Sequence, residues 1–401
     1  MKMISPVNFL DNENLNQIIS DNLVMVNSGD WHFGSLDPEY QYNVLYNQLV
    51  LPCYSIDLDV FVIAGDIFDK KNLASSKTVM FACLLLSKIV EMCKAKNVTL
   101  LIIKGTDEHD AGQLKLFYSY LQDPDLDIRI VESISFLYIK GCRFLCIPEE
   151  YNKSEDYYNE YLLYSGIYDI CVMHGMFKGA VYQDQVILPE NVNPRNKLFT
   201  IEDFINCRGL IISGHVHTPG CFNTYFYYCG CPYRWRFGEE HAKGFIITLY
   251  NKRSAQHYNH FQEIISEQYI TLNLDDMLDR DPKETIYYVE LVLQDIEYLR
   301  LEFLKAPTDE QLANINILKN YFRTNNRVKI KTTNSKKQKI VETLNIENER
   351  LKEFMFIMDK QLSPYEKFAR YINIKEGCEY TSAQEIEELI SEEFWGGENF
   401  G

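Results

Sequence analysis

The sequence predicts an α/β protein, and three observations lead to this fold class. Short apolar runs recur between residues 23 and 250, and each ends in a polar turn that contains Asp or His. Residues 76–94, between the second and third runs, carry apolar side chains at helical spacing, as a crossover between parallel strands requires. Beyond about residue 250 no further run ends in such a turn. We therefore expect an α/β domain first and a smaller unit after it.

Five strands are expected in the first part of the chain, each followed by one of these turns. They are residues 23–26, 60–64, 100–103, 169–173 and 210–212. A hairpin is expected from residues 136–139 and 143–147, which a turn at Gly141 joins and Pro148 closes. Strand, helix and strand in succession favour a parallel arrangement, in which the polar turns gather at one edge.

Changes in composition divide the chain into three parts. These are an α/β domain at 1–250, a smaller α+β unit at 251–340 and a helical tail at 341–401. In the second part we expect strands at 287–293 and 327–331, with a helix at 308–321 between them.

Composition and charge exclude several classes of protein. Hydrophobic residues make up 46% of the 401 residues and aromatic residues 13%, which excludes a disordered or collagen-like chain. The net charge of −17 argues against a protein that coats nucleic acid by bulk electrostatics, so any such contact needs a local basic patch. Eleven Cys without a CxxC pair predict reduced thiols. With no signal peptide and no long apolar run, a soluble, cytoplasmic protein is expected.

Six side chains of metal-binding type lie in the expected turns: Asp30, His32, Asp66, His174, His215 and His217. Ligands of open α/β sheets bind outside the carboxyl ends of the strands, where these turns lie. Carboxylates and imidazoles in similar numbers suit Mn, Fe or Zn better than Mg. Six ligands exceed what one ion with an open position needs, so we expect two ions that share a carboxylate, with Asp66 as the bridge.

Each of these motifs, taken alone, also has a purely structural explanation. An Asp-x-His such as Asp30 to His32 is most often a surface turn, and Asp66 would serve as a helix cap. A lone His174 would more often be a hydrogen-bonded core residue. All the motifs in this order, each after an expected strand, favour a metal site instead.

The turns resemble the motifs of calcineurin-like metallophosphoesterases. The matching segments are GD-x-H at 29–32, GD-x-x-D at 65–69, a GNH-like turn at 105–110, His174-Gly175 and GH-x-H at 214–217. Residues 228–239, followed by Lys243-Gly244, look like the segment that ends in F-G-E and K-G in SbcD-type DNA repair nucleases, including bacteriophage recombination subunits. The resemblance covers about residues 22–250 and, more loosely, the tail. It implies the sandwich fold of that superfamily, a smaller α+β capping domain and a helical C-terminal tail.

The resemblance also implies an activity and partners. The chain would be a manganese-dependent phosphodiesterase with two Mn²⁺ ions, or Mg²⁺ or another divalent ion in their place. It would act on DNA ends in recombination and repair, as a 3′–5′ exonuclease with endonuclease activity. Its partners would be an SbcC-type ABC ATPase with a coiled coil and a second copy of the chain, in the host cytoplasm if phage-encoded. Two alternatives stay open, a metallophosphoesterase for a non-DNA substrate and a non-catalytic DNA-end scaffold.

Carried over residue by residue, the resemblance implies a role for each site residue. One ion would be held by Asp30, His32, Asp66 and His217, and the other by Asp66, His174 and His215. His109 would protonate or stabilise the leaving oxygen, and Asp110 would orient its imidazole. Asp69 would lie near the second ion.

One turn departs from the family pattern. Where the family has Gly-Asn-His, this chain has two extra residues and reads Gly-Thr-Asp-Glu-His at 105–109. If the His aligns, Glu108 takes the position of the metal-binding Asn and would supply a carboxylate oxygen. If the turn is remodelled, Asp107 or Thr106 would supply the ligand instead. Solvated loop charges are the structural alternative.

Basic residues are expected to contact DNA, and a helix in the tail is expected to contact the ATPase. Contacts to phosphates are expected from Arg234, Arg236, Arg327, Lys329 and Lys331, although a charge run is often only a solvated face. In the tail, helices are expected at 340–358 and after Ser363 and Thr381. The helix after Ser363 would place Tyr365, Phe368 and Ile372 on one face, either to bind the ATPase or to pack on its own domain.

Overall fold

The computed structural model describes residues 21–182, 185–186, 195–305 and 307–332, together with positions 366, 369, 382 and 384. Within these residues the chain forms two compact units. The first unit runs to Thr271 and also includes Glu290–Arg300, and the second consists of Leu272–Val289 and the residues from Leu301 onward. All the residues of the candidate metal site, from Asp30 to Glu239, belong to the first unit.

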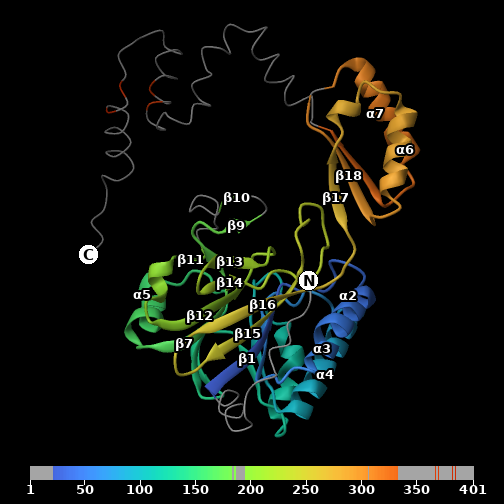
Figure 1. The fold of residues 1–401 in the computed structure, drawn as a ribbon. Helices are drawn as coiled ribbons and strands as arrows, with labels where there is room; N and C mark the ends of the chain where they lie inside the picture. The colour runs from blue at the N-terminus through green and yellow to red at the C-terminus, as the bar shows by residue number, and fades with distance from the viewer. Residues whose placement is uncertain are drawn as a thin grey trace, which may run out of the picture. The chain divides into compact units, whose positions relative to one another are not determined.

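The first unit contains two six-stranded sheets (Figure 1). The first sheet has the order β16-β15-β1-β2-β3-β4, in which β1 to β4 are parallel and β15 and β16 are antiparallel additions. Its strands are β1 (Asn22–Ser28), β2 (Val60–Ala64), β3 (Thr99–Ile103), β4 (Ile128–Val131), β15 (Gly244–Asn251) and β16 (His257–Glu263).

The second sheet has the order β13-β14-β12-β7-β6-β5, with parallel central strands and antiparallel edges. Its strands are β5 (Ser135–Ile139), β6 (Cys142–Ile147), β7 (Tyr168–His174), β12 (Cys207–Gly214), β13 (Gly220–Asn223) and β14 (Phe226–Tyr228). Two small two-stranded sheets add β8 (Met176–Phe177), β9 (Val181–Tyr182), β10 (Gln185–Val186) and β11 (Leu198–Phe199).

The two sheets pack face to face, with helices outside them. Side chains alternate between the two faces of a strand, so Val60 and Val62 of β2 share a core with Val172 of the second sheet, whereas Phe61 and Ile63 face the helices. Figure 1 shows α4 on one side of the sheets and α5 on the other. The helices of this unit are α2 (Pro38–Leu45), α3 (Leu51–Cys53), α4 (Lys77–Lys96) and α5 (Glu155–Asn159).

The expected strands and hairpin of this unit are confirmed. All five predicted runs form β1, β2, β3, β7 and β12, and the predicted crossover helix is α4. The hairpin joins β5 to β6 through Lys140 and Gly141, whose φ angles of 48° and 84° are those of a tight two-residue turn. The chain therefore has the mixed α/β architecture that the sequence predicts.

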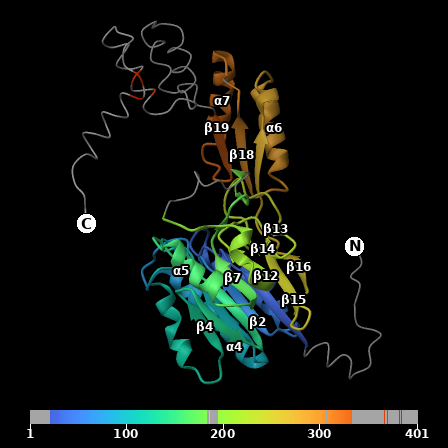
Figure 2. The ribbon, with the colours of Figure 1, turned by 90° about the vertical axis from the view of Figure 1, so that its left-hand side faces the viewer.

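The chain after β16 forms a three-stranded sheet of β17 (Tyr269–Asn273), β18 (Tyr298–Phe303) and β19 (Val328–Thr332). Figure 2 shows the helices α6 (Pro282–Val292) and α7 (Asp309–Tyr321) beside β18 and β19. The helix expected at 308–321 and the strand expected at 327–331 are confirmed. Thr308 and Gln311 form a capping box at the start of α7.

The strand expected at 287–293 is wrong, because these residues belong mostly to helix α6. Thr285 and Val289, four residues apart, are buried, while Tyr287 between them is 69% exposed. A spacing of four residues between buried side chains is helical. The same apolar residues produce the weak alternation of apolar and polar positions from which a strand was predicted.

The helices expected at 340–358 and after Ser363 and Thr381 lie outside the described residues, apart from single positions. No helix in the described part of the chain has the length and apolarity to span a membrane.

Candidate metal centre

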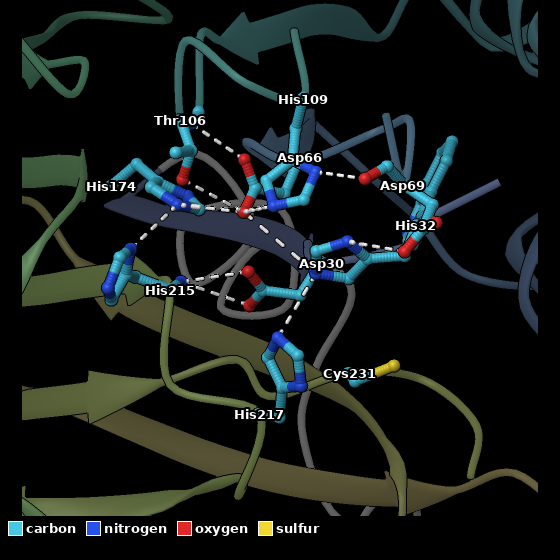
Figure 3. A network of polar contacts seen from close by, with 12 residues as sticks. Asp30, His32, Asp66, Asp69, Thr106, His109, His174, His215, His217 and Cys231 are labelled. Atoms are coloured by element: carbon cyan, nitrogen blue, oxygen red, sulfur yellow. Dashed lines mark hydrogen bonds and ion pairs between the residues drawn. The ribbon is translucent and has the colours of Figure 1, made fainter. Parts of the chain in front are cut away.

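The polar side chains of the candidate site follow strands at their carboxyl ends, in both sheets. Asp30 and His32 follow β1, Asp66 follows β2, Thr106 and His109 follow β3, Glu149 follows β6, His174 ends β7, and His215 and His217 follow β12. Figure 3 shows the imidazoles of His32, His109, His174, His215 and His217 turned toward one another around Asp66 and Asp30. The parallel strands of the two packed sheets therefore bring residues distant in sequence to one place.

Four of these residues have left-handed backbone conformations, which are uncommon for residues other than Gly. The φ angles are 50° at Asp30, 45° at His32, 53° at Asp66 and 86° at His215. Backbone hydrogen bonds hold two of the turns together: the Asp30 N–H donates to the Gly65 carbonyl (2.9 Å) and the His32 N–H to the Asp66 carbonyl (3.0 Å). Such strain persists where the surrounding structure fixes it and is concentrated at functional sites.

Asp30, His32 and His217 form the first donor group. All three are buried, and their donor atoms lie within 4.8 Å of one another. The Nε2 atoms of His32 and His217 are 3.0 Å apart. Nδ1 of His217 lies 2.7 Å from Oε1 of Glu239, which orients the ring and leaves Nε2 for the site, as carboxylates do for metal-bound imidazoles.

Glu149, His174 and His215 form the second donor group. Nδ1 of His174 donates to the Ala64 carbonyl (2.8 Å), so Nε2 is the nitrogen that faces the site. That Nε2 lies 3.2 Å from Nδ1 of His215, and Oε2 of Glu149 lies 3.2 Å from the same His215 nitrogen. Gly65 makes room for this arrangement, because a Cβ there would come 2.3 Å from His174 Nδ1.

Asp66 lies between the two groups. Its Oδ2 is 3.3 Å from Nε2 of His174 in the second group and 3.9 Å from Nε2 of His32 in the first. A carboxylate in this position can be shared by two ions, as in two-metal sites. The donors are carboxylate oxygens and imidazole nitrogens, a set that suits Mn, Fe or Zn. These buried His, Asp and Glu groups therefore have the composition and spacing to hold divalent metal ions.

The imidazoles and carboxylates shift one another's pKa. Burial lowers the pKa of His32 well below its usual value. Burial opposes the charged form of His174 as well, but the carboxylates of Asp66, Asp30 and Glu149 outweigh it and raise the pKa of His174 well above its usual value. In the same way, the charge of His174 outweighs burial and holds the pKa of Asp66 well below its usual value. In the metal-free protein His174 therefore carries the positive charge that an ion would replace.

Metal binding is expected to release a proton and to strengthen as the pH rises through neutrality. A metal binds the deprotonated imidazole, and the raised pKa of His174 means that its Nε2 must lose a proton first. Apparent affinity should increase by up to about tenfold per pH unit for each proton released. Calorimetric titration with Mn²⁺ in buffers of different ionisation enthalpy measures the proton release. Affinity that is independent of pH between about 6 and 8 would contradict this prediction.

His109 lies beside the first donor group, but Asp110 does not orient it. Nδ1 of His109 donates to the backbone carbonyl of Asp69, which leaves Nε2 facing Asp66 at 4.0 Å from Oδ2. The expected role of Asp110 is therefore wrong. Asp110 is fully buried, and its carboxylate accepts hydrogen bonds from four backbone N–H groups, those of Asp66, Ile67, Phe68 and Gly105. Asp69 itself lies near His32, with 4.0 Å between Oδ1 and Nδ1.

Asp110 joins the turn after β2 to the turn after β3, and its removal should destabilise the fold. Burial raises the pKa of Asp110 to about 7. Asp110→Ala would leave four buried N–H groups without their acceptor, which we expect to lower the free energy of unfolding by about 3 kcal/mol or more. Urea unfolding at pH 8 measures this loss. Asp125→Ala, at an exposed loop position, should change it by less than about 0.5 kcal/mol, and an equal effect of both changes would contradict the assignment.

The turn at 105–109 does not place Glu108 in the site. Glu108 is exposed, and Asp107 forms an ion pair with Lys104 (2.8 Å). Of the three candidate ligands in this turn, Thr106 faces the site, where its backbone N–H donates to Oδ1 of Asp66 (2.7 Å). The two extra residues therefore lie between Thr106 and His109, away from the donor groups, and the expectation that Glu108 is a ligand is wrong.

Sequence reasoning missed Glu149. It follows the second strand of the predicted hairpin, and its carboxylate is buried beside His174 and His215. The signal was present, because Glu149 comes directly after an apolar run and Pro148, as the other site residues follow theirs. Its importance depends on the parallel pairing of β6 with β7, which joins segments more than twenty residues apart.

The predicted DNA-binding residues lie in different places. Arg236 lies near the first donor group, where its Nε donates to Oε1 of Glu239 (3.0 Å). Arg234 donates to the Glu240 carbonyl (3.5 Å). Lys329 and Lys331 lie on the exposed face of β19, where Lys331 pairs with Glu302 (3.0 Å), and the exposed Arg327 directly precedes the strand. The predicted partner-binding residues fall outside the described residues: Tyr365, Phe368 and Ile372.

The chain has no match among family models or curated proteins, and its matches among solved structures are weak. No family model matches the chain, and no curated protein matches it. One crystal structure aligns with 60% of this chain and all of its own, at 12% identity and a TM-score of 0.37. A mutant of a cold-active protein tyrosine phosphatase aligns over 59% of this chain and 80% of its own, at 10% identity and a TM-score of 0.27. Similarity at these scores carries no argument about fold or function.

Proposed function

We propose that this protein is a metal-dependent phosphodiesterase that cleaves DNA, as a 3′–5′ exonuclease with endonuclease activity. The observation that carries the proposal is the pair of buried donor groups that meet at Asp66, with His109 beside them. The family resemblance of the turns that supply these residues leads to the same activity. Manganese is the proposed ion, because the donor set suits Mn, Fe or Zn and the resemblance to SbcD-type nucleases favours Mn among them.

The chain's own residues have separate tasks in this reaction. Two bound divalent ions would supply a hydroxide nucleophile near neutral pH and neutralise charge on the phosphodiester. Asp30, His32 and His217 would hold one ion and His174 and His215 the other, with Asp66 shared. His109, whose Nδ1 proton is held by the Asp69 carbonyl, would present Nε2 to the leaving oxygen and deliver a proton to it.

A nucleic-acid substrate is supported by the segment at 228–239, which folds against the first donor group. The Trp235 ring lies 5.4 Å from the His32 ring and 5.8 Å from the His217 ring, measured between centroids. The Arg236 guanidinium lies over Trp235 at 4.6 Å. An aromatic ring and a guanidinium beside a metal centre are suited to a nucleotide, because bases stack on rings and Arg binds phosphate.

The proposed partners follow from the resemblance to SbcD-type nucleases. They are DNA ends, an SbcC-type ABC ATPase and a second copy of this chain. Co-purification of the full chain with such an ATPase, compared with a Tyr365→Asp, Phe368→Asp double variant, tests the role of the predicted tail helix. Retention of the ATPase by the double variant would show that this helix is not its binding site.

The activity is tested on linear duplex DNA labelled at its 5′ ends, with Mn²⁺ or with a chelator. We expect Mn²⁺-dependent shortening of the labelled strands from their 3′ ends. Hydrolysis of an aryl phosphodiester without any DNA cleavage would instead favour a phosphoesterase for another substrate. Binding of DNA ends without hydrolysis of either substrate would favour a scaffold.

A further inference from the structure

Glu149 has the position and surroundings of a ligand to the second ion. Strand β6 pairs in parallel with β7, in register Ile147 with Met173, so the residues that follow the two strands emerge side by side. His174 is the last residue of β7, and Oε2 of Glu149 lies 3.7 Å from its Nε2. The same oxygen lies 3.2 Å from Nδ1 of His215. The three donor atoms therefore surround one point.

The Glu149 carboxylate is buried and oriented by neutral donors. Its side chain is 6% exposed, and Oε1 accepts a hydrogen bond from the Asn196 amide (2.7 Å). In the part of the chain that the structure describes, the basic side chains within 4.0 Å of it are the imidazoles of His174 and His215. A buried carboxylate that lies beside two imidazoles has the surroundings of a metal ligand, because a cation held by the three side chains would balance its charge.

Thr106 lies between the carboxylates of Asp66 and Glu149 and contacts both. Its hydroxyl is 3.2 Å from Oδ2 of Asp66 and 3.2 Å from Oε2 of Glu149. Its backbone N–H donates to the other Asp66 oxygen, and Figure 3 shows Thr106 beside Asp66. A hydroxyl carries one proton, so Oγ1 donates to one of these two oxygens at a time, and in either case it orients a carboxylate without binding the metal itself. Thr106 is thus a positioning residue.

We propose that Glu149 is a direct anionic ligand of the second ion and replaces the neutral amide that this turn lacks. This inference rests on the two-ion centre of the proposed function. Each ion then has two carboxylates and two imidazoles, with Asp66 common to both: Asp30, His32 and His217 complete the first set, and Glu149, His174 and His215 the second.

Metal stoichiometry and affinity test the role of Glu149 without reference to activity. The full chain, Glu149→Gln and Glu150→Gln are titrated with Mn²⁺ by calorimetry, and bound metal is counted after gel filtration. Glu150 is the matched control, because it is equally buried but bonds to Tyr157 and the Ile134 N–H. We expect two ions in the wild type and in Glu150→Gln, and in Glu149→Gln one ion with the second bound at least about tenfold more weakly.

A second measurement separates lost coordination from lost folding. Electron paramagnetic resonance of the Mn²⁺-loaded wild type should show the spin-coupled spectrum of an ion pair, and Glu149→Gln the spectrum of an isolated ion. Glu149→Asp, which keeps the carboxylate, should restore part of the coupled signal. Two ions of unchanged affinity in Glu149→Gln would overturn the inference, as would equal loss in Glu150→Gln. Loss of the second ion without DNA cleavage by the wild type would instead uphold the ligand and refute the proposed substrate.

Discussion

Replacing Asp66 with Asn is expected to remove shared coordination from both ions and to lower DNA cleavage by about a thousandfold or more. Asp66 contacts both donor groups through Oδ2, and an amide in its place carries no charge to hold two cations together. The variant should still fold, because an Asn carbonyl oxygen can keep the hydrogen bond from the Thr106 N–H. Cleavage rates and bound Mn²⁺ per chain, measured on the same preparation, check both parts.

Asp107→Asn is the control for Asp66→Asn. Asp107 lies in the turn after β3, near the site in sequence, but its carboxylate is paired with Lys104 rather than directed at the donor groups. Its metal content and cleavage rate should stay within about twofold of the wild type, since a surface ion pair contributes little. An Asp66→Asn variant that keeps two ions and wild-type cleavage would refute the shared carboxylate.

The sequence was informative about the site because of one property of parallel sheets. Strands β1, β2, β7 and β12 are short buried runs, and the residue types that follow them are those that bind metals. Since carboxyl ends of parallel strands lie on the same edge of a sheet, local patterns were enough to group Asp30 with Asp66 in the first sheet and His174 with His215 in the second. The packing of the two sheets against each other, which local patterns do not indicate, brings the two pairs together.

The parts that sequence reasoning missed depend on pairing and on backbone contacts. Glu149 became part of the site only because β6 lies beside β7. Asp110 looked like a partner for the adjacent His109, but its real partners are backbone N–H groups, three of them more than forty residues away. Backbone donors leave no pattern in side-chain identity, so no motif could have indicated them.

The edge of the first sheet was similarly hard to predict. Strand β16 is polar and mostly exposed, with little of the apolar alternation by which half-buried strands are recognised. Its conformation depends on antiparallel pairing with β15 along its whole length, from Gly244 opposite Glu263 to Tyr250 opposite His257. A change in composition near residue 250 therefore marks the move from buried strands to an edge strand, and the compact unit continues to Thr271.

Replacing His109 with Ala is expected to lower DNA cleavage by about a hundred- to ten-thousandfold while both ions remain bound. His109 is 24% exposed at its side chain, so it is accessible to substrate, and the Asp69 carbonyl fixes which nitrogen faces the site. Its proposed task is to protonate the leaving sugar oxygen, a strongly basic group. An aryl phosphodiester releases a weakly basic phenolate, so the same variant should lose far less activity on that substrate.

Glu108→Gln, an exposed neighbour, should cleave both substrates at the wild-type rate. Equal losses of His109→Ala on the two substrates would contradict proton donation, and loss of one ion would make His109 a ligand, as its proximity to His32 and Asp66 would permit.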